Sequence, residues 1–324
     1  MTRATYRRAL RAVVVALLAG AVGAGAQPAP ARVGFLAPDE EPRFTELATA
    51  LAQGLRERGH SDAQLVHGRV RRGDAAAARA GAEELVRQRA SAVFVVGSAL
   101  VRPVREVAPA LPIVFITPGD PVAAGLVTSL AKPGRHTTAM TFEYPELSAK
   151  RLELLSELAP AARRILVIFD GRDPSPRQGL AAARTLATRL KLTLVERAVG
   201  SAAEVAPALG ALDDADALLA IPGGAAANHY AAMVRAANTK RRPAIFHTRG
   251  AETKDALVTY GARDAEIARQ AARLVDKVLK GADAGELPVE RPARLTLSIN
   301  QTTAKALGLT IPRATLARAD EVVE

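Results

Sequence analysis

The residues that most often do chemistry in proteins are few in this chain and stand in no catalytic spacing. Cysteine is absent, which excludes disulfides, thiolate nucleophiles, zinc–thiolate sites and a lipidated cysteine anchor. The five histidines form neither an HExxH pattern nor a two-histidine metal spacing; they are His60, His67, His136, His229 and His247. Gly97-Ser98 lacks the flanking glycines of a serine nucleophile elbow. We therefore expect no metal site and no enzyme.

Phosphate-binding glycine motifs are also missing from the sequence. The stretch from Gly54 to Ser61 has the spacing of a phosphate loop, but His60 stands where that motif needs lysine. The segment is instead predicted to be helical, with Gly59 just past the helix end. No Gly-Xaa-Gly-Xaa-Xaa-Gly fingerprint follows a predicted strand, so we expect no dinucleotide and no other cofactor.

The elements that would position a binding site follow one repeated pattern. Short apolar runs alternate with longer amphipathic segments, which predicts βαβ units and parallel sheets covered by helices on both faces. Strands are predicted over residues 32–37, 92–96, 112–117, 164–169, 217–221 and 244–248, with further extended segments over 137–142, 256–261 and 288–300. Helices are predicted over residues 44–58, 75–89, 148–158, 176–190, 225–238 and 264–279.

The six main strands fall into two similar sets of three. The run 111–117 (LPIVFIT) resembles 242–248 (RPAIFHT), and each is followed two residues later by a glycine. We interpret the chain as an α/β protein with two doubly wound, Rossmann-like lobes joined by a three-segment hinge near residues 140, 260 and 288. The predicted boundaries are a signal peptide (1–26), lobe 1 (27–139 plus 262–285) and lobe 2 (140–261 plus 286–324). The alternative is two unrelated doubly wound domains with similar buried strands.

Ligands of open α/β sheets bind beyond the carboxyl ends of the strands, and this rule selects the candidate site. Helix N-termini at those turns favour anionic groups such as a carboxylate. Phe142 and Tyr260, at two of the crossovers, could stack on a flat ligand or belong to the hinge core. The predicted ligand-binding residues are Asp39, Ser98, Thr117, Asp120, Phe142, Asp170, Gly223, Arg249 and Tyr260.

Two of these residues form a hypothesis about charge. Asp120 and Arg249 follow corresponding strands of the two sets, so they would approach when the lobes close. A zwitterionic solute would then place its ammonium near Asp120 and its carboxylate near the forked guanidinium of Arg249. In the alternative interpretation Asp120, which precedes Pro121, only caps a helical turn, and Arg249 is an exposed loop arginine.

The first 26 residues have the organisation of an export signal. Four arginines and no acidic residue precede the apolar run 12–18 (AVVVALL), and small residues end the segment at Ala26. This order predicts a secretory signal peptide cleaved before Gln27, without a lipid, although a retained membrane anchor and twin-arginine export stay open. The formal net charge of +11 then falls to +7, carried by scattered residues, so we expect no nucleic-acid partner.

Several stretches, in order along the chain, resemble the substrate-binding protein family of ABC transporters that includes the tryptophan/tyrosine-binding (TrpX-like) periplasmic proteins. They are 54–59 (GLRERG), 113–127 (IVFITPGDPVAAGLV), 147–155 (LSAKRLELL), 275–281 (VDKVLKG), 287–290 (LPVE), 300–312 (NQTTAKALGLTIP) and 318–322 (RADEV). The resemblance implies a type I clamshell, or Venus flytrap, that captures a small solute and delivers it to a membrane permease. The loops at 39–43, 170–176 and 223–229 depart from the family pattern.

The leading functional hypothesis is therefore a periplasmic solute-binding protein, expected to be a monomer, that serves an ABC permease and its ATPase. The solute would be an amino acid or a related small acid. A periplasmic ligand sensor acting through a separate membrane receptor is the main alternative, followed by an exported enzyme of unrecognised type. A DNA-binding regulator on the same clamshell is disfavoured, because its helix-turn-helix would occupy the place of the signal peptide.

Overall fold

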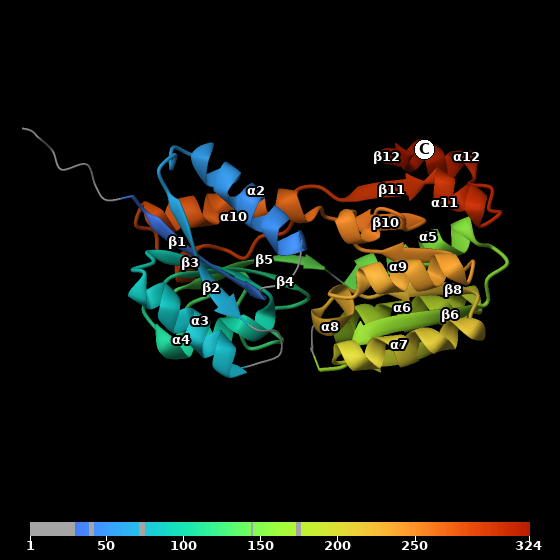
Figure 1. Ribbon diagram of the computed structural model, residues 1–324, viewed down its shortest axis with the longest axis horizontal. Helices are drawn as coiled ribbons and strands as arrows, with labels where there is room; N and C mark the ends of the chain where they lie inside the picture. Colours follow the sequence, from blue (N-terminus) through green and yellow to red (C-terminus); the bar gives the residue numbers. More distant parts are fainter. Residues whose placement is uncertain (1–29, 39–41, 71–74, 144, 173–175) are drawn as a thin grey trace, which may run out of the picture. The chain divides into compact units, whose positions relative to one another are not determined.

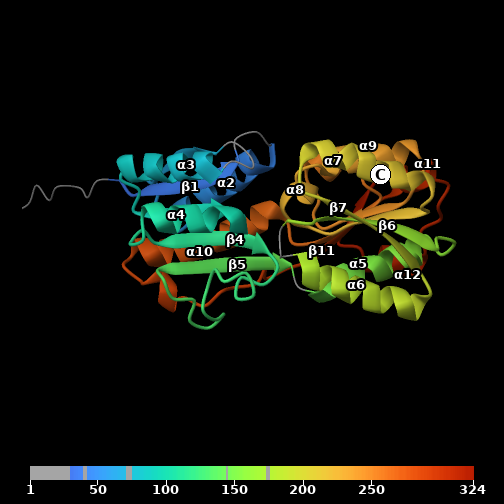
Figure 2. The same cartoon turned by 90° about the horizontal axis from the view of Figure 1, so that it is seen from below.

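Two β-sheets organise the computed structural model, which describes residues 30–38, 42–70, 75–143, 145–172 and 176–324 (Figure 1). The predicted signal peptide, its cleavage point and the candidate residue Asp39 lie outside the described residues. Helices cover both faces of each sheet, as Figure 2 shows from a second direction. The expectation of an α/β fold built on largely parallel sheets is confirmed.

The first sheet has five parallel strands in the order β2-β1-β3-β4-β5. The strands are β1 (Arg32–Pro38), β2 (Gln64–Val70), β3 (Ala92–Val96), β4 (Ile113–Pro118) and β5 (Thr137–Glu143). One face packs on α2 and α10, and the other on α3 and α4. These helices are α2 (Pro42–Arg56), α3 (Ala75–Arg87), α4 (Val101–Val107) and α10 (Asp264–Leu279). Both faces are thus buried, which is why β3 and β4 are apolar along their length.

The second sheet has seven strands in the order β12-β11-β10-β9-β8-β6-β7, and only the β10–β11 pair is antiparallel. The strands are β6 (Arg164–Asp170), β7 (Thr193–Val199), β8 (Ala217–Ala220), β9 (Ala244–Phe246), β10 (Val258–Gly261), β11 (Thr296–Asn300) and β12 (Glu321–Val323). The helices are α5 (Pro145–Leu158), α6 (Pro176–Leu190), α7 (Ala202–Gly210), α8 (Gly224–Ala227), α9 (Tyr230–Thr239), α11 (Gln301–Ala306) and α12 (Arg313–Arg318). Short 3-10 helices include η1 (Ser98–Leu100), η2 (Ala211–Asp213), η3 (Ala251–Thr253) and η4 (Ala284–Glu286).

The two sheets share one strand order. The first reads β2-β1-β3-β4-β5, and the second, from its opposite edge, begins β7-β6-β8-β9-β10. The runs 111–117 and 242–248, which are similar in sequence, therefore lead into β4 and β9 at matching places in the two sheets. The lobe boundaries at residues 139–140, 261–262 and 285–286 and the hinge remain predictions.

Three strands, β2, β7 and β12, were not expected from the sequence. All three are outermost strands: β2 and β7 lie at corresponding edges of the two sheets, and β12 lies at the other edge of the second sheet. Their sequences, QLVHGRV, TLVERAV and EVV, carry charged or polar side chains. An edge strand is covered on one side only, so it lacks the continuous apolar run that marks a central strand.

Other element boundaries differ in detail from the prediction. The helix expected over 225–238 is split into α8 and α9, because His229 takes a non-helical backbone conformation with φ −123° and ψ 23°. Of the extended segment 288–300, only residues 296–300 form a strand, while Glu290 makes an isolated bridge to Met140. Pro292 interrupts the intervening stretch, since proline has no N–H to give to a sheet. α2 ends at Arg56, and Gly59 lies with φ +92° in the turn that follows it.

Candidate functional site

The carboxyl ends of the strands carry most of the predicted site residues. Thr117 is in β4 and is buried, with its hydroxyl donating to the Pro118 carbonyl at 3.2 Å. Ser98 begins η1 directly after β3 and is partly exposed. Asp170 ends β6 and accepts a hydrogen bond from the Arg172 N–H at 2.8 Å. These turns thus lie at the carboxyl ends of the strands, where open α/β sheets bind their ligands. Ligand contact by any of these residues remains a prediction.

The charges proposed for a ligand clamp both have partners of their own in the structure. The Asp120 carboxylate accepts from the backbone N–H groups of Val122 at 2.8 Å and Ala123 at 3.2 Å, which is the geometry of a capping aspartate. Arg249 lies with its Nε 3.7 Å from Oε2 of Glu321. The observed contacts therefore match the structural alternative for Asp120. Titration of Asp120→Asn and Arg249→Gln variants with the identified ligand would test the clamp.

Glu321, on the edge strand β12, pairs with two arginines: Arg249, which follows β9, and Arg263, which precedes α10. The Ser298 hydroxyl donates to its Oε2 at 2.6 Å, and Arg263 pairs with the same oxygen. That hydrogen bond first, and then the charges of Arg263 and Arg249, hold the pKa of Glu321 below its usual value. The two arginines are thus directed toward β12.

An aromatic cluster joins the two sheets. The ring of Phe142, in β5 of the first sheet, stacks on the imidazole of His247, which follows β9 of the second, with centroids 5.6 Å apart and planes at 21°. Tyr230 on α9 shares a 2.8 Å hydrogen bond with Nδ1 of His247. The three side chains are at most 4% exposed. In this conformation Phe142 is thus part of a packed core, as its alternative interpretation expected.

Tyr260 and Gly223 both contribute through the backbone, and the Tyr260 side chain also packs against the core of the second sheet. The Tyr260 carbonyl, in β10, accepts a 2.7 Å hydrogen bond from Nε of Arg151, a fully buried arginine on α5. Gly223 has φ 145° and directs the chain from β8 into α8. The burial of Arg151 could not be predicted, because its lysine and glutamate neighbours are typical of an exposed helix face.

A small cavity lies where the helices of the first sheet meet the end of β9. Its volume is about 20 Å³, enough for about one water molecule. The lining residues come from α2, α9, the β9–η3 turn and α10: Glu46, Tyr230, Thr248, Gly250, Ala251, Glu252, Thr253 and Asp264. A β-carbon at Gly250 would lie 3.9 Å from Oε2 of Glu46, so α2 and η3 are close neighbours.

Thr253 fixes the conformation of the turn that borders this cavity. Its hydroxyl donates to the Thr248 carbonyl at 2.8 Å and accepts from the Gly250 N–H at 3.0 Å. The sequence predicts a ligand-binding residue in this turn, at Arg249. The structure places Thr248, Gly250 and Thr253 at the cavity.

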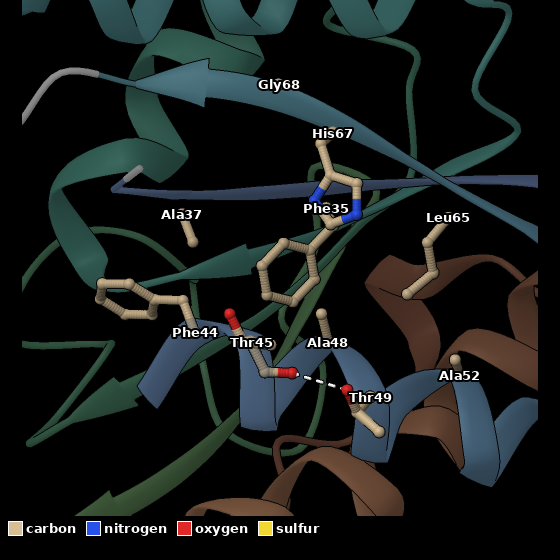
Figure 3. Close-up of a pocket in the computed structure, with 10 residues that line it drawn as sticks. All are labelled: Phe35, Ala37, Phe44, Thr45, Ala48, Thr49, Ala52, Leu65, His67 and Gly68. Carbon is tan, nitrogen blue, oxygen red and sulfur yellow. Dashed lines mark hydrogen bonds between the residues drawn. The ribbon is translucent and has the colours of Figure 1, made fainter. Parts of the chain in front are cut away.

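A larger hollow of about 390 Å³ lies between α2 and the edge of the first sheet (Figure 3). It exists because β2 is the outermost strand, so Leu65 and His67 are incompletely covered. Its lining is Phe35, Ala37, Phe44, Thr45, Ala48, Thr49, Ala52, Leu65, His67 and Gly68, which includes none of the predicted site residues. The Thr49 hydroxyl is bonded to the Thr45 carbonyl within α2 at 2.8 Å. This hollow is a gap at a sheet edge, separate from the candidate site.

Within the residues that the structure describes, no group of three or more histidine, aspartate or glutamate side chains is arranged to hold a metal ion. None of the helices in this part of the chain combines the length and apolarity that a membrane crossing requires.

Comparison with known proteins identifies the family. Residues 32–323 match the family model described as ABC transporter substrate binding protein. The chain belongs to this family. The fold, the sequence resemblance and the assignment as an ABC-transporter substrate-binding protein are thereby confirmed, and the family is not a class of enzymes.

Two of the proteins that this chain is similar to are named with an aromatic amino acid. This chain is 24% identical over 273 residues to the tyrosine-binding protein of Clostridioides difficile (strain R20291), and the match covers 83% of this chain and 79% of the relative. A Streptococcus pneumoniae ABC domain solved in complex with L-Trp has a TM-score of 0.81 at 21% identity, over 90% of this chain and 99% of that one. A conserved domain protein from Vibrio cholerae has the same TM-score at 25% identity, with the same two coverages.

Proposed function

We propose that this substrate-binding protein captures an aromatic amino acid, such as L-tryptophan or L-tyrosine, between elements of its two sheets. It acts as a monomer in the periplasm after loss of residues 1–26. From there it delivers the amino acid to an ABC permease driven by its ATPase.

One structural observation supports this function most directly. The cavity at the end of β9 is lined from α2 and α10, which cover the first sheet, and from α9, η3 and Thr248, which belong to the second. The stacked pair Phe142–His247 joins the same two sheets. A ligand held there would contact elements of both sheets, so its binding energy could favour one arrangement of the two sheets relative to each other. The ligands named for the two relatives support an aromatic amino acid.

Capture requires the cavity to widen. A volume of about 20 Å³ admits one water-sized group, far less than a whole amino acid. Entry of L-tryptophan would therefore separate α2 from η3, and the elements would close again around the bound molecule.

Calorimetric titration with L-tryptophan and L-tyrosine tests the ligand class. We expect saturable binding of at least one of them, and no binding of L-alanine or D-ribose at the same concentrations. Tight binding of a sugar together with no binding of either aromatic amino acid would overturn the proposal.

Export and delivery need separate measurements. Intact mass of the exported protein should correspond to a chain that begins at Gln27, and a mass that includes residues 1–26 would contradict cleavage. Cells that lack the protein should lose uptake of the labelled ligand. Unchanged uptake in those cells would favour the periplasmic sensor.

A further inference from the structure

Three arginines gather where α4 meets the connection between β4 and β5. Because these two strands are parallel neighbours, the connection must run back along the edge of the first sheet to reach the start of β5. Nη2 of Arg102 donates to the Ala124 carbonyl at 3.3 Å, and Nη2 of Arg105 donates to the Leu126 carbonyl at 2.7 Å. Both arginines of α4 thus contact the connection, and Arg135 lies at its end, two residues before β5 begins.

Arg105 is a partly buried cation held by neutral groups. Besides the Leu126 carbonyl, its Nη2 contacts the Thr137 hydroxyl at 3.4 Å. Its Nε is buried and has no hydrogen-bond partner within the described residues. Burial, and then the positive charges of Arg135 and Arg102, lower the pKa of Arg105. Three positive charges therefore lie close enough to repel one another, which costs free energy.

No carboxylate of the described residues compensates these charges. The acidic side chains that lie near the three arginines in the sequence or at the start of β5 belong to other pairs, which are Glu106–Arg79, Asp283–His136 and Glu286–Lys132. Arg102, Arg105 and Arg135 form no ion pair within the described part of the chain. An anion from outside the chain would supply the missing negative charge.

The number and the chemistry of these cations favour a phosphate group as that anion. The planar guanidinium fork matches the spacing of phosphate oxygens and binds them through two parallel hydrogen bonds. A carboxylate has one negative charge and two oxygens, so it offsets only one of three arginines. A phosphate group carries about two negative charges at neutral pH and at least three acceptor oxygens, so it accepts hydrogen bonds from several arginines at once.

We propose that Arg102, Arg105 and Arg135 form a binding site for a phosphate group. Arg105 is held in place by the Leu126 carbonyl and the Thr137 hydroxyl, and the exposed side chains of Arg102 and Arg135 reach the same anion. The phosphate is either free in solution or the headgroup of an anionic phospholipid. A headgroup would hold the protein at a membrane surface, whereas free phosphate would only stabilise the folded chain.

This site is separate from the one predicted for the solute. Thr137 begins β5, so Arg105 extends toward the amino end of that strand. The predicted solute site lies beyond the carboxyl ends of the strands. The inference therefore goes beyond the proposed function, and it is tested without any amino acid present.

Matched salts test the site on the parent protein. Sodium phosphate should raise the melting temperature above the values in sodium chloride and sodium acetate of equal ionic strength, because a ligand of the folded state stabilises it. In calorimetric titrations with inorganic phosphate, Arg102→Gln and Arg135→Gln should each weaken binding about ten-fold, and Arg105→Gln at least as much. Acetate that binds as tightly as phosphate would point to a carboxylate of a protein partner and overturn the phosphate site.

Arg135→Gln keeps the test decisive if Arg105→Gln fails to fold. Without phosphate, the variant loses a repulsive charge, so its melting temperature should equal or exceed that of the parent. With phosphate, its melting temperature should rise less than that of the parent. Arg189→Gln removes the same charge from an exposed position at the end of α6 and should respond to phosphate as the parent does.

Vesicles distinguish the two sources of phosphate. The parent is sedimented with vesicles of phosphatidylcholine alone and with vesicles of equal parts phosphatidylglycerol and phosphatidylcholine. Binding to the mixed vesicles that Arg102→Gln and Arg135→Gln lose and Arg189→Gln retains would identify a lipid headgroup. Binding of inorganic phosphate without binding of vesicles would identify free phosphate.

Three results would overturn the site: binding of neither probe, variants of the three arginines that bind as the parent does, or an equal loss in Arg189→Gln. The last would reduce the effect to net charge. Each of these results leaves the proposed capture of an aromatic amino acid standing, because that capture is measured separately by titration with L-tryptophan and L-tyrosine.

Discussion

Thr248 and Thr253 lie at the two ends of one turn, and only the hydroxyl of Thr253 forms hydrogen bonds within the described residues. Thr253 is 1% exposed, and its Oγ1 both donates to the Thr248 carbonyl and accepts from the Gly250 N–H. Replacement by valine would leave that carbonyl and that N–H without their partner. We expect Thr253→Val to lower the free energy of unfolding by about 1–3 kcal/mol, measured by urea denaturation.

Thr248→Val is the matched control for this prediction. Its hydroxyl has no partner within the described residues, so the same chemical change should alter the free energy of unfolding by less than about 0.5 kcal/mol, or raise it. Equal destabilisation by the two variants would contradict the assigned hydrogen bonds.

At the scale of elements, β9 and β10 approach too closely at one point for any residue but glycine. A β-carbon on Gly261 would lie 2.1 Å from the carbonyl oxygen of His247 and 3.2 Å from Nη2 of the buried Arg151. Because the nearest atom is backbone, the strands themselves would have to shift. We expect Gly261→Ala to lower the free energy of unfolding by about 1–3 kcal/mol in chemical denaturation.

Gly210→Ala provides the comparison, because Gly210 ends α7 with φ −56° and a β-carbon there would meet no atom within 4 Å. Alanine at that position should leave stability unchanged or raise it by up to about 1 kcal/mol. A Gly261→Ala variant as stable as Gly210→Ala would be inconsistent with the observed approach.

Asp216 ties the beginnings of two neighbouring strands, β6 and β8. Its Oδ2 accepts from the backbone N–H groups of Arg164 and Arg163, each at 2.8 Å. These hydrogen bonds hold the pKa of Asp216 below its usual value of 3.8. A carboxylate with a lowered folded-state pKa contributes stability that is present above its unfolded-state pKa and lost as the pH falls through the folded value.

Asp216→Asn should therefore cost about 1 kcal/mol of unfolding free energy at pH 7, and the difference from the parent should shrink below about pH 4. Denaturation curves at pH 7 and pH 3 measure it. Asp214→Asn, at an exposed position nearby, should differ from the parent by less than about 0.5 kcal/mol at both values. A cost for Asp216→Asn that is independent of pH would argue against a charge effect.

For the whole molecule, ligand binding should change the average separation of the elements that line the cavity. The free protein must sample wider arrangements to admit an amino acid, and the bound molecule then holds α2 and η3 together. Small-angle scattering with saturating L-tryptophan should give a smaller radius of gyration than scattering without it. An unchanged radius, with binding verified by calorimetry in the same buffer, would contradict this closure.

The sequence by itself determined the central strands and the repeat of their order. A strand buried on both faces must be apolar throughout, so runs such as AVFVV and RILVIF predict β3 and β6 without further information. The amphipathic spacing of residues 264–279 likewise predicted α10 with its observed ends. The edge strands β2, β7 and β12 were not predicted, because a strand covered on one side carries polar residues and resembles a loop in sequence.

Only the tertiary structure decided which side chains meet. Phe142 and His247 lie about a hundred positions apart, and Glu46 and Glu252 about two hundred, yet each pair borders one cluster or one cavity. Periodicity reports the side of an element that is covered, but not the distant residue that covers it. The burial of Arg151, the capping role of Asp120 and the small cavity beside Thr248 therefore emerge only when the strands are placed side by side.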